Sequence, residues 1–176
     1  WGVVLRNIIL LDCSISGNDY VGGLAGQIWW NSHVHNTQFN GEVSGNDYVG
    51  ALVGENDQGD ITGSYVLGSV SGRYYIGGVV GENYYGIVSD CYSTCTVSGT
   101  GSVGGLVGLN SNYGEILRSH SQGDTVATSY RVGGIVGLNW NECVVAYSIS
   151  SGSVVGNSCL LYTSDAADEE DSVDLG

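Results

Sequence analysis

The chain has no proline, no methionine and no lysine, and charged side chains make up only 12% of its 176 residues. Four arginines are its only permanently positive side chains, against 18 carboxylates, so the formal net charge is −14. Nucleic acids and anionic lipid surfaces attract proteins through basic side chains, and this deficit argues against both as partners. No apolar run reaches the roughly 18 residues of a transmembrane helix, so membrane insertion is not expected.

Windows of good helix propensity are also missing, because 30 glycines are spread along the chain. The apolar residues are mostly Val, Ile, Leu and Tyr in short runs, and Gly, Asn, Asp and Ser separate these runs. This pattern is typical of short strands joined by turns. The sequence therefore predicts an all-β fold.

A hexapeptide of the type Val-Gly-Gly-Leu-Val-Gly occurs five times with little change. Its copies begin at Val21, Val49, Ile76, Val103 and Val132, which are 28, 27, 27 and 29 residues apart. A nearly constant period of this length predicts a repeat architecture, in which each unit buries its apolar face against the next unit. No catalytic residue type recurs with the hexapeptide.

Each hexapeptide is followed by an arm that ends near Val-Ser-Gly, as in residues 61–72 and 88–99. The arm at 116–127 fits only if one residue is inserted. One unit holds three short strands and three corners, and stacked parallel units rise about 4.8 Å each. We therefore expect a parallel β-helix, or β-solenoid, of about five coils of 27–29 residues, truncated at both ends.

Equivalent residues of successive coils should lie directly above one another. Two interior rows are expected, one made of Val21, Val49, Ile76, Val103 and Val132, and the other of Ile15, Val43, Val70, Val97 and Val126.

Strand alternation alone would make both faces of the hexapeptide apolar. Either the strand is covered on both sides, or a kink at a glycine turns Val and Leu inward together, which we favour. The direction of the row Leu24, Leu52 and Leu106 stays open at this level. Ala51 shows that a Cβ fits at the third position, whereas the second and sixth positions are always glycine and are expected to need left-handed backbone. The structural glycines at the second position are Gly22, Gly50, Gly77, Gly104 and Gly133.

The hexapeptide, the Asn two residues after it and the Ser/Cys-Tyr-x-x-Gly-x-Val-Ser-Gly arm together resemble the GLUG motif. The resemblance covers nearly all of residues 15–156, although Gln27 and Ile28 depart from it and make the first corner doubtful. It implies a β-helical region of a bacterial surface or adhesin-like protein, of a kind also found in non-catalytic parts of IgA-cleaving metallopeptidases. It transfers no catalytic residue.

The composition changes abruptly after residue 156, where another hexapeptide is due. The segment from Cys159 onward resembles the translation of a DNA sequencing adapter, and the alternative is a natural acidic, disordered tail. We therefore divide the chain into a repeat domain, residues 1–156, and a non-native, disordered tail, residues 157–176. Because Trp1 starts within a partial repeat, the segment is expected to continue into further repeats of a larger chain.

Four cysteines lie in the repeat domain. Cys91 and Cys95 are four residues apart in an extended arm, about 13 Å by strand rise, which is too far for a disulfide. Cys13 and Cys95 align with Gly68, which indicates packing in a small space. All four, including Cys91 and Cys143, are expected to be free thiols inside the fold.

Other chemical motifs are weak. His33 and His35 alternate in a strand without a third metal ligand, and residues 99–104 match a dinucleotide fingerprint but are followed by strand residues instead of the helix that the fingerprint requires. We therefore expect no metal, no cofactor and no catalytic residue.

Two sets of repeated side chains remain. The first is a set of aromatic residues that could bind a ligand or simply stabilise corners: Tyr20, Tyr48, Tyr75, Trp30, Tyr85, Tyr113 and Trp140. The second is a set of asparagines expected to form a structural hydrogen-bonded ladder: Asn56, Asn83, Asn110 and Asn139.

These features predict a non-enzymatic repeat module of a secreted or cell-surface bacterial protein that serves adhesion or acts as a spacer. Its expected partner is a host or cell-surface glycan or protein. The alternatives are a fragment of a polysaccharide-processing β-helix enzyme, which would need a groove of clustered charged residues, and a carbohydrate-binding solenoid.

Overall fold

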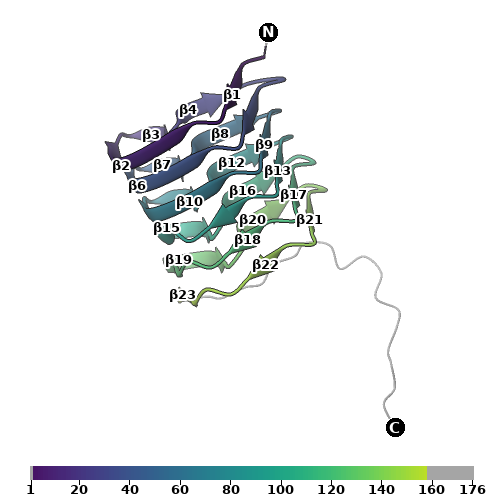
Figure 1. Ribbon diagram of the computed structural model, residues 1–176. Helices are drawn as coiled ribbons and strands as arrows, with labels where there is room; N and C mark the ends of the chain where they lie inside the picture. The colour runs from purple at the N-terminus through teal and green to yellow at the C-terminus, as the bar shows by residue number, and fades with distance from the viewer. Residues whose placement is uncertain (1, 158–176) are drawn as a thin grey trace.

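The computed structural model describes residues 2–157, which form 23 β-strands and no helix. The chain winds into a stack of parallel coils, with β1 near one end of the stack and β23 at the other (Figure 1). The predicted adapter-derived tail from Cys159 onward lies outside the described residues. Within residues 2–157 there is consequently no helix that could span a lipid bilayer.

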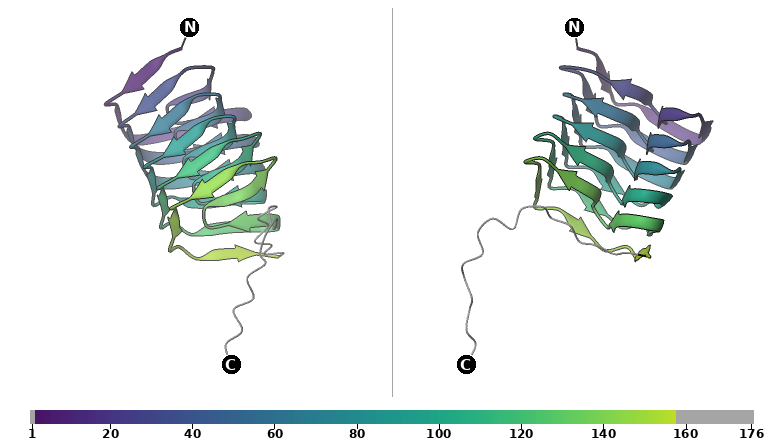
Figure 2. Two further views of the ribbon diagram at one scale, coloured as in Figure 1. Left: turned by 90° about the vertical axis from the view of Figure 1, so that its right-hand side faces the viewer. Right: turned by 180° about the vertical axis from the view of Figure 1, so that it is seen from behind.

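Three parallel sheets make up the walls of the solenoid (Figure 2). The six-stranded sheet contains β1 (Val4–Arg6), β5 (His33–His35), β9 (Asp60–Thr62), β13 (Ile87–Ser89), β17 (Glu115–Leu117) and β21 (Val144–Ala146). The five-stranded sheet contains β4 (Ala25–Ile28), β8 (Val53–Asp57), β12 (Val80–Tyr84), β16 (Val107–Ser111) and β20 (Val136–Trp140).

The twelve-stranded sheet has two neighbouring columns of strands. One column begins with β2 (Ile9–Ser16), β6 (Gln38–Ser44) and β10 (Tyr65–Ser71) and continues through β14 (Tyr92–Ser93), β18 (His120–Ser121) and β22 (Ile149–Ser150). The other contains β3 (Asp19–Gly22), β7 (Asp47–Gly50) and β11 (Tyr74–Gly77). The strands β15 (Thr96–Gly104) and β19 (Thr125–Gly133) run through both columns, and β23 (Val154–Gly156) pairs with β19.

The register of these sheets follows the sequence period. Ile76, for example, pairs with Val49 on one side and with Val103 on the other, and each of these pairings is parallel. The first corner keeps this register although it departs from the motif, since Gln27 pairs with Glu55 and Ile28 with Asn56. The predicted parallel β-solenoid is therefore confirmed.

The hexapeptide forms a sharp corner between two sheets. In the second coil, β7 ends at Gly50, the chain bends at Ala51 and Leu52, and β8 begins at Val53. Val49, Leu52 and Val53 are all fully buried, so the bend brings the valine and leucine rows into the same core. The favoured kink is present, and the Leu row points inward.

The explanation predicted for the hexapeptide glycines is wrong. Positive φ angles among the described glycines occur only at Gly63 and Gly68, and neither belongs to a hexapeptide. The glycines at the second and sixth positions instead lie against neighbouring backbone: a Cβ on Gly104 would overlap the carbonyl of Val107, and one on Gly108 the peptide of Tyr75. They are needed because two strands approach each other closely.

One interior row also differs from the prediction. Ile15, Val43, Val70 and Val97 align as expected, but the next member is the fully buried Thr125, while Val126 pairs with Ser98. The inserted residue lies beyond the arm, where the register shifts between the Gly99–Ala127 and Gly101–Tyr130 pairs. The extra residue forms a β-bulge within β19, and beyond it the register is regular again, with Val103 paired to Val132.

Candidate functional site

The aromatic residues predicted as a possible ligand site lie on two different corners. Tyr20, Tyr48 and Tyr75, here called the tyrosine stack, belong to β3, β7 and β11, just before the hexapeptide corner. The others lie at the ends of the strands of the five-stranded sheet or in the turns that lead to the six-stranded sheet. Together with Trp29 and Tyr84 they are here called the aromatic corner, which comprises Trp29, Trp30, Tyr84, Tyr85, Tyr113 and Trp140. Strands of the five-stranded sheet lie between the two groups, and within residues 2–157 no ring of one group contacts a ring of the other.

The rings of the tyrosine stack lie face to face. The centroids of Tyr20 and Tyr48 are 4.8 Å apart, and those of Tyr48 and Tyr75 are 5.0 Å apart. Each of the three has a positive φ, between 54° and 60°, a conformation that a bulky residue rarely adopts. Burial, followed by the carboxylate of Glu82, raises the pKa of Tyr48 to about 12. The central ring is thus well packed.

The aromatic corner is more open. Tyr84 and Tyr85 meet edge to face with centroids 4.7 Å apart, and Tyr85 stacks on Tyr113 at 5.8 Å. Tyr85, Tyr113 and the tryptophans Trp30 and Trp140 are all exposed. The carboxylate of Glu142 raises the pKa of Tyr113. These rings are available for contact with a ligand.

The asparagines form a continuous ladder inside the same corner. The Nδ2 of Asn56 donates to Oδ1 of Asn83 at 2.7 Å, Asn83 donates to Asn110 at 2.8 Å, and Asn110 donates to Asn139 at 2.8 Å. Each Nδ2 also donates to a carbonyl of the following turn, as Asn83 does to Gly86 at 2.8 Å. The ladder ties each turn to its own coil and each coil to the next.

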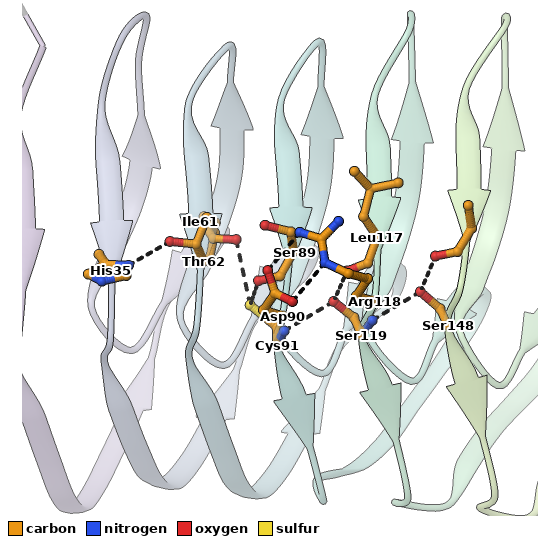
Figure 3. A network of polar contacts seen from close by, with 11 residues as sticks. His35, Ile61, Thr62, Ser89, Asp90, Cys91, Leu117, Arg118, Ser119 and Ser148 are labelled. Carbon is orange, nitrogen blue, oxygen red and sulfur yellow. Dashed lines mark hydrogen bonds and ion pairs between the residues drawn. The ribbon is translucent and has the colours of Figure 1, made fainter.

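A second polar row follows the six-stranded sheet (Figure 3). The amide of Cys91 donates to Oγ of Ser119 at 3.1 Å, and the amide of Ser119 donates to Oγ of Ser148 at the same distance. On the outside, Arg118 donates to both carboxylate oxygens of Asp90, at 2.8 and 2.9 Å. Cys91 takes the place of a hydroxyl residue in this row.

The cysteines inside the described region are free, and three of the four are buried. Burial raises the pKa of both Cys91 and Cys95 to about 12. Cys13, which is partly exposed, borders a shallow groove of about 470 Å³ lined also by Asp12, Asn40 and Glu42. The raised pKa makes the thiols of Cys91 and Cys95 poor nucleophiles at neutral pH.

The histidines have separate partners. His33 lies 3.0 Å from the carboxylate of Asp60, and Nδ1 of His35 lies 2.7 Å from Oγ1 of Thr62. Residues 2–157 contain no group of three or more His, Cys, Asp or Glu side chains that could hold a metal ion.

Sequence reasoning missed one further aromatic row. Tyr65 stacks on Tyr92 with centroids 5.2 Å apart, and Tyr92 meets His120 edge to face at 5.1 Å. The 27-residue spacing between Tyr65 and Tyr92 was the signal that could have revealed it.

Comparison with known proteins gives two matches. The family model of the GLUG motif matches residues 45–71, 72–98 and 99–127. A crystal structure described as a "putative immunoglobulin A1 protease" from Bacteroides ovatus has a TM-score of 0.66 and 24% sequence identity, over 87% of this chain and 50% of that one. At this identity the likeness establishes the fold alone, and this chain spans only half of that structure. No curated protein matches the chain.

Proposed function

We propose that this chain, whose residues 45–127 are GLUG-motif repeats, is a non-catalytic module of a secreted or cell-surface bacterial protein, and that it serves adhesion or holds other parts of that protein apart. The extracellular setting is supported by the resemblance to surface-protein repeats. It is also supported by the similar structure from Bacteroides ovatus, whose name refers to an extracellular substrate.

The observation that carries the proposal is the continuity of the column. Backbone pairing, the asparagine ladder and the interior rows all run from coil to coil along the same axis. Such a solenoid is stiff and can be lengthened by adding coils, because each coil contacts mainly its neighbours. These are the mechanical properties that a spacer or a presenting stalk requires.

The contacts made by the charged, histidine and cysteine side chains support a structural role. Arg118 is held by Asp90, Arg73 donates to Asp47, and His33 lies against Asp60, each pair joining neighbouring coils. The buried thiols pack inside the walls. These groups link coils instead of converging on one cleft.

The test is to couple the full chain to beads and to measure their binding to a glycan array and to cultured epithelial cells. Specific binding supports adhesion. If neither surface is bound, the spacer role is tested by inserting the chain between two fluorophores: a fixed, long separation supports it, whereas a variable, short one contradicts it.

A carbohydrate-binding solenoid is a second candidate, favoured by the exposed rings of the aromatic corner. The rival reading as a fragment of a polysaccharide-processing enzyme makes a separate prediction, namely the release of shorter saccharides from a polysaccharide panel. Detection of such products by mass spectrometry would contradict the non-catalytic proposal.

A further inference from the structure

Tyr85 and Tyr113 adopt a backbone conformation that is unfavourable for tyrosine. Their φ angles are 51° and 61°, and a bulky residue in this region costs on the order of 1 kcal/mol or more. The same corner in other coils uses polar residues: Asn31, Gln58 and Asn141 have φ angles of 57°, 62° and 65°, and Glu142, opposite Tyr113, has a φ of 56°. The turn therefore does not require tyrosine.

Burial does not explain these two tyrosines. Tyr85 is 45% exposed and Tyr113 is 52% exposed, whereas Tyr48, whose φ is also positive at 58°, is half-buried and stacked on both faces. The strain at Tyr48 is offset within the fold. The strain at Tyr85 and Tyr113 points to a partner outside the fold.

The neighbouring tryptophans share this exposure. Trp29, Trp30 and Trp140 are 61%, 70% and 58% exposed, and they lie on the same corner at the two ends of the described stack. With the tyrosines between them, the rings extend over the rise of about four coils, or roughly 20 Å. Tyr and Trp provide large, rigid contact surfaces at low entropic cost, which suits binding.

The polar groups beside the rings narrow the choice of ligand. Asp57, Asp60, Glu115 and Glu142 are the carboxylates at this corner, with His33 against Asp60, and the amides of Gln58, Asn112 and Asn141 lie among them. Gln58 donates to Asp57, and Asn141 donates to Asn112. The arginines lie elsewhere: Arg6 ends β1, Arg73 and Arg118 pair with Asp47 and Asp90, and Arg131 packs over Tyr130. An anionic ligand would be repelled.

The shape of the corner further restricts the kind of ligand that it can bind. Only Tyr85 and Gly86 separate β12 from β13, and only residues 112–114 separate β16 from β17. A ridge this narrow cannot provide the roughly 800 Å² per partner of a standard protein interface. It can support a chain one ring wide, with flat apolar faces for the aromatic rings and hydroxyl groups for the flanking amides and carboxylates.

We propose that the aromatic corner binds a neutral polysaccharide that lies along the solenoid axis. This inference rests on the proposed function and assigns the ligand face to this corner instead of to the tyrosine stack. Tyr85 and Tyr113 form the central contact, and Trp30 and Trp140 lie toward its ends.

The test uses the full chain and defined probes: cellohexaose, xylohexaose and mannohexaose as neutral saccharides, and a hexagalacturonate as the acidic one. Calorimetry should show binding of at least one neutral probe, with a change in tryptophan fluorescence and weaker binding of the hexagalacturonate. The double variant Tyr85→Asn/Tyr113→Asn removes both rings but keeps a residue that tolerates the turn. Its affinity should fall at least about tenfold, while its Tm stays equal or rises.

The matched control is Tyr48→Asn in the tyrosine stack, which should lower the Tm and leave the affinity unchanged. The inference is overturned if no neutral probe binds, if the double variant binds as well as the wild type, or if the hexagalacturonate binds more tightly. Mass spectrometry of the probes after incubation separates this result from the proposed function. Shortened probes would refute the non-catalytic role, whereas intact probes with no binding would refute only the ligand assignment.

Discussion

Replacement of Asn83 by Ala should be among the most destabilising single changes in this protein. Asn83 is fully buried in the middle of the ladder, where it accepts from Asn56 at 2.7 Å and donates to Asn110 and to the carbonyl of Gly86, both at 2.8 Å. Alanine removes all three hydrogen bonds, so Nδ2 of Asn56, Oδ1 of Asn110 and the carbonyl of Gly86 each lose the hydrogen bond to residue 83. A buried polar group that loses its partner costs about 1–3 kcal/mol.

The total loss should therefore be about 3–5 kcal/mol, since the three partners can relax in part. For a protein of this size, 1 kcal/mol corresponds to about 2–4 °C in Tm, so the melting temperature should fall by roughly 6–20 °C. The measurement is thermal and urea unfolding followed by far-UV circular dichroism. Asn139→Ala, in the half-buried last rung of the ladder, is the matched control and should cost less.

A second variant tests whether hydrogen bonding is the cause. Asn83→Asp keeps the shape but replaces the donor by a carboxylate that faces the oxygens of Asn110 and Gly86. Folding should raise the pKa of this new carboxyl, so the variant should be most stable below the ordinary pKa of Asp and should lose stability as the pH rises through the folded-state value. A loss below about 0.5 kcal/mol for Asn83→Ala, or no pH dependence for Asn83→Asp, would refute the reasoning.

Three further predictions concern thiols, charge and repeat number. Iodoacetamide at pH 7.5 should label Cys13 in the folded protein, and the buried thiols only after unfolding; rapid labelling of all of them, read by peptide mass spectrometry, would contradict the observed burial. Burial raises the pKa of Glu82, although a hydrogen bond from Ser111 partly opposes this shift. The protonated form of Glu82 therefore stabilises the fold at low pH, and this stabilisation is lost as the pH rises through the folded-state pKa. Glu82→Gln should therefore raise the Tm at pH 7, and the gain should disappear near about pH 4; a gain that is the same at both pH values would show that burial of the charge is not its cause. Deletion of residues 77–103 removes one period and should leave a shorter folded solenoid, whereas deletion of 77–102 leaves one extra residue inside the buried strand β11 and should lower the Tm further; equal melting curves would contradict the register.

Much of the fold could be predicted from the sequence because a solenoid repeats its contacts. The 27-residue spacing places Val49, Ile76 and Val103 in one column, and the structure pairs them. Local exceptions were harder to foresee. Thr125 occupies an interior position for which Val126 was the better apolar match, because the extra residue lies in a bulge that follows within β19.

The role of the hexapeptide glycines was also beyond the sequence. The presence of glycine at the same positions of every copy indicates a structural constraint. Glycine is suited both to a positive φ and to the close approach of another backbone, so the sequence does not distinguish these two causes. Only the position of the neighbouring coil separates these causes: Gly108 lies against the peptide of Tyr75, and the positive φ falls on Tyr75 itself.

The sequence by itself determined the all-β architecture, the length of a coil, the parallel register and the identity of most interior residues. Each of these follows from the repeat of 27–29 residues. The tertiary structure decided where the corners bend and which aromatic residues share a surface. Tyr48 and Tyr85 both have a positive φ, yet one is packed within a stack and the other lies on an open ridge. That difference depends on which strands approach each other in space, which no local pattern records.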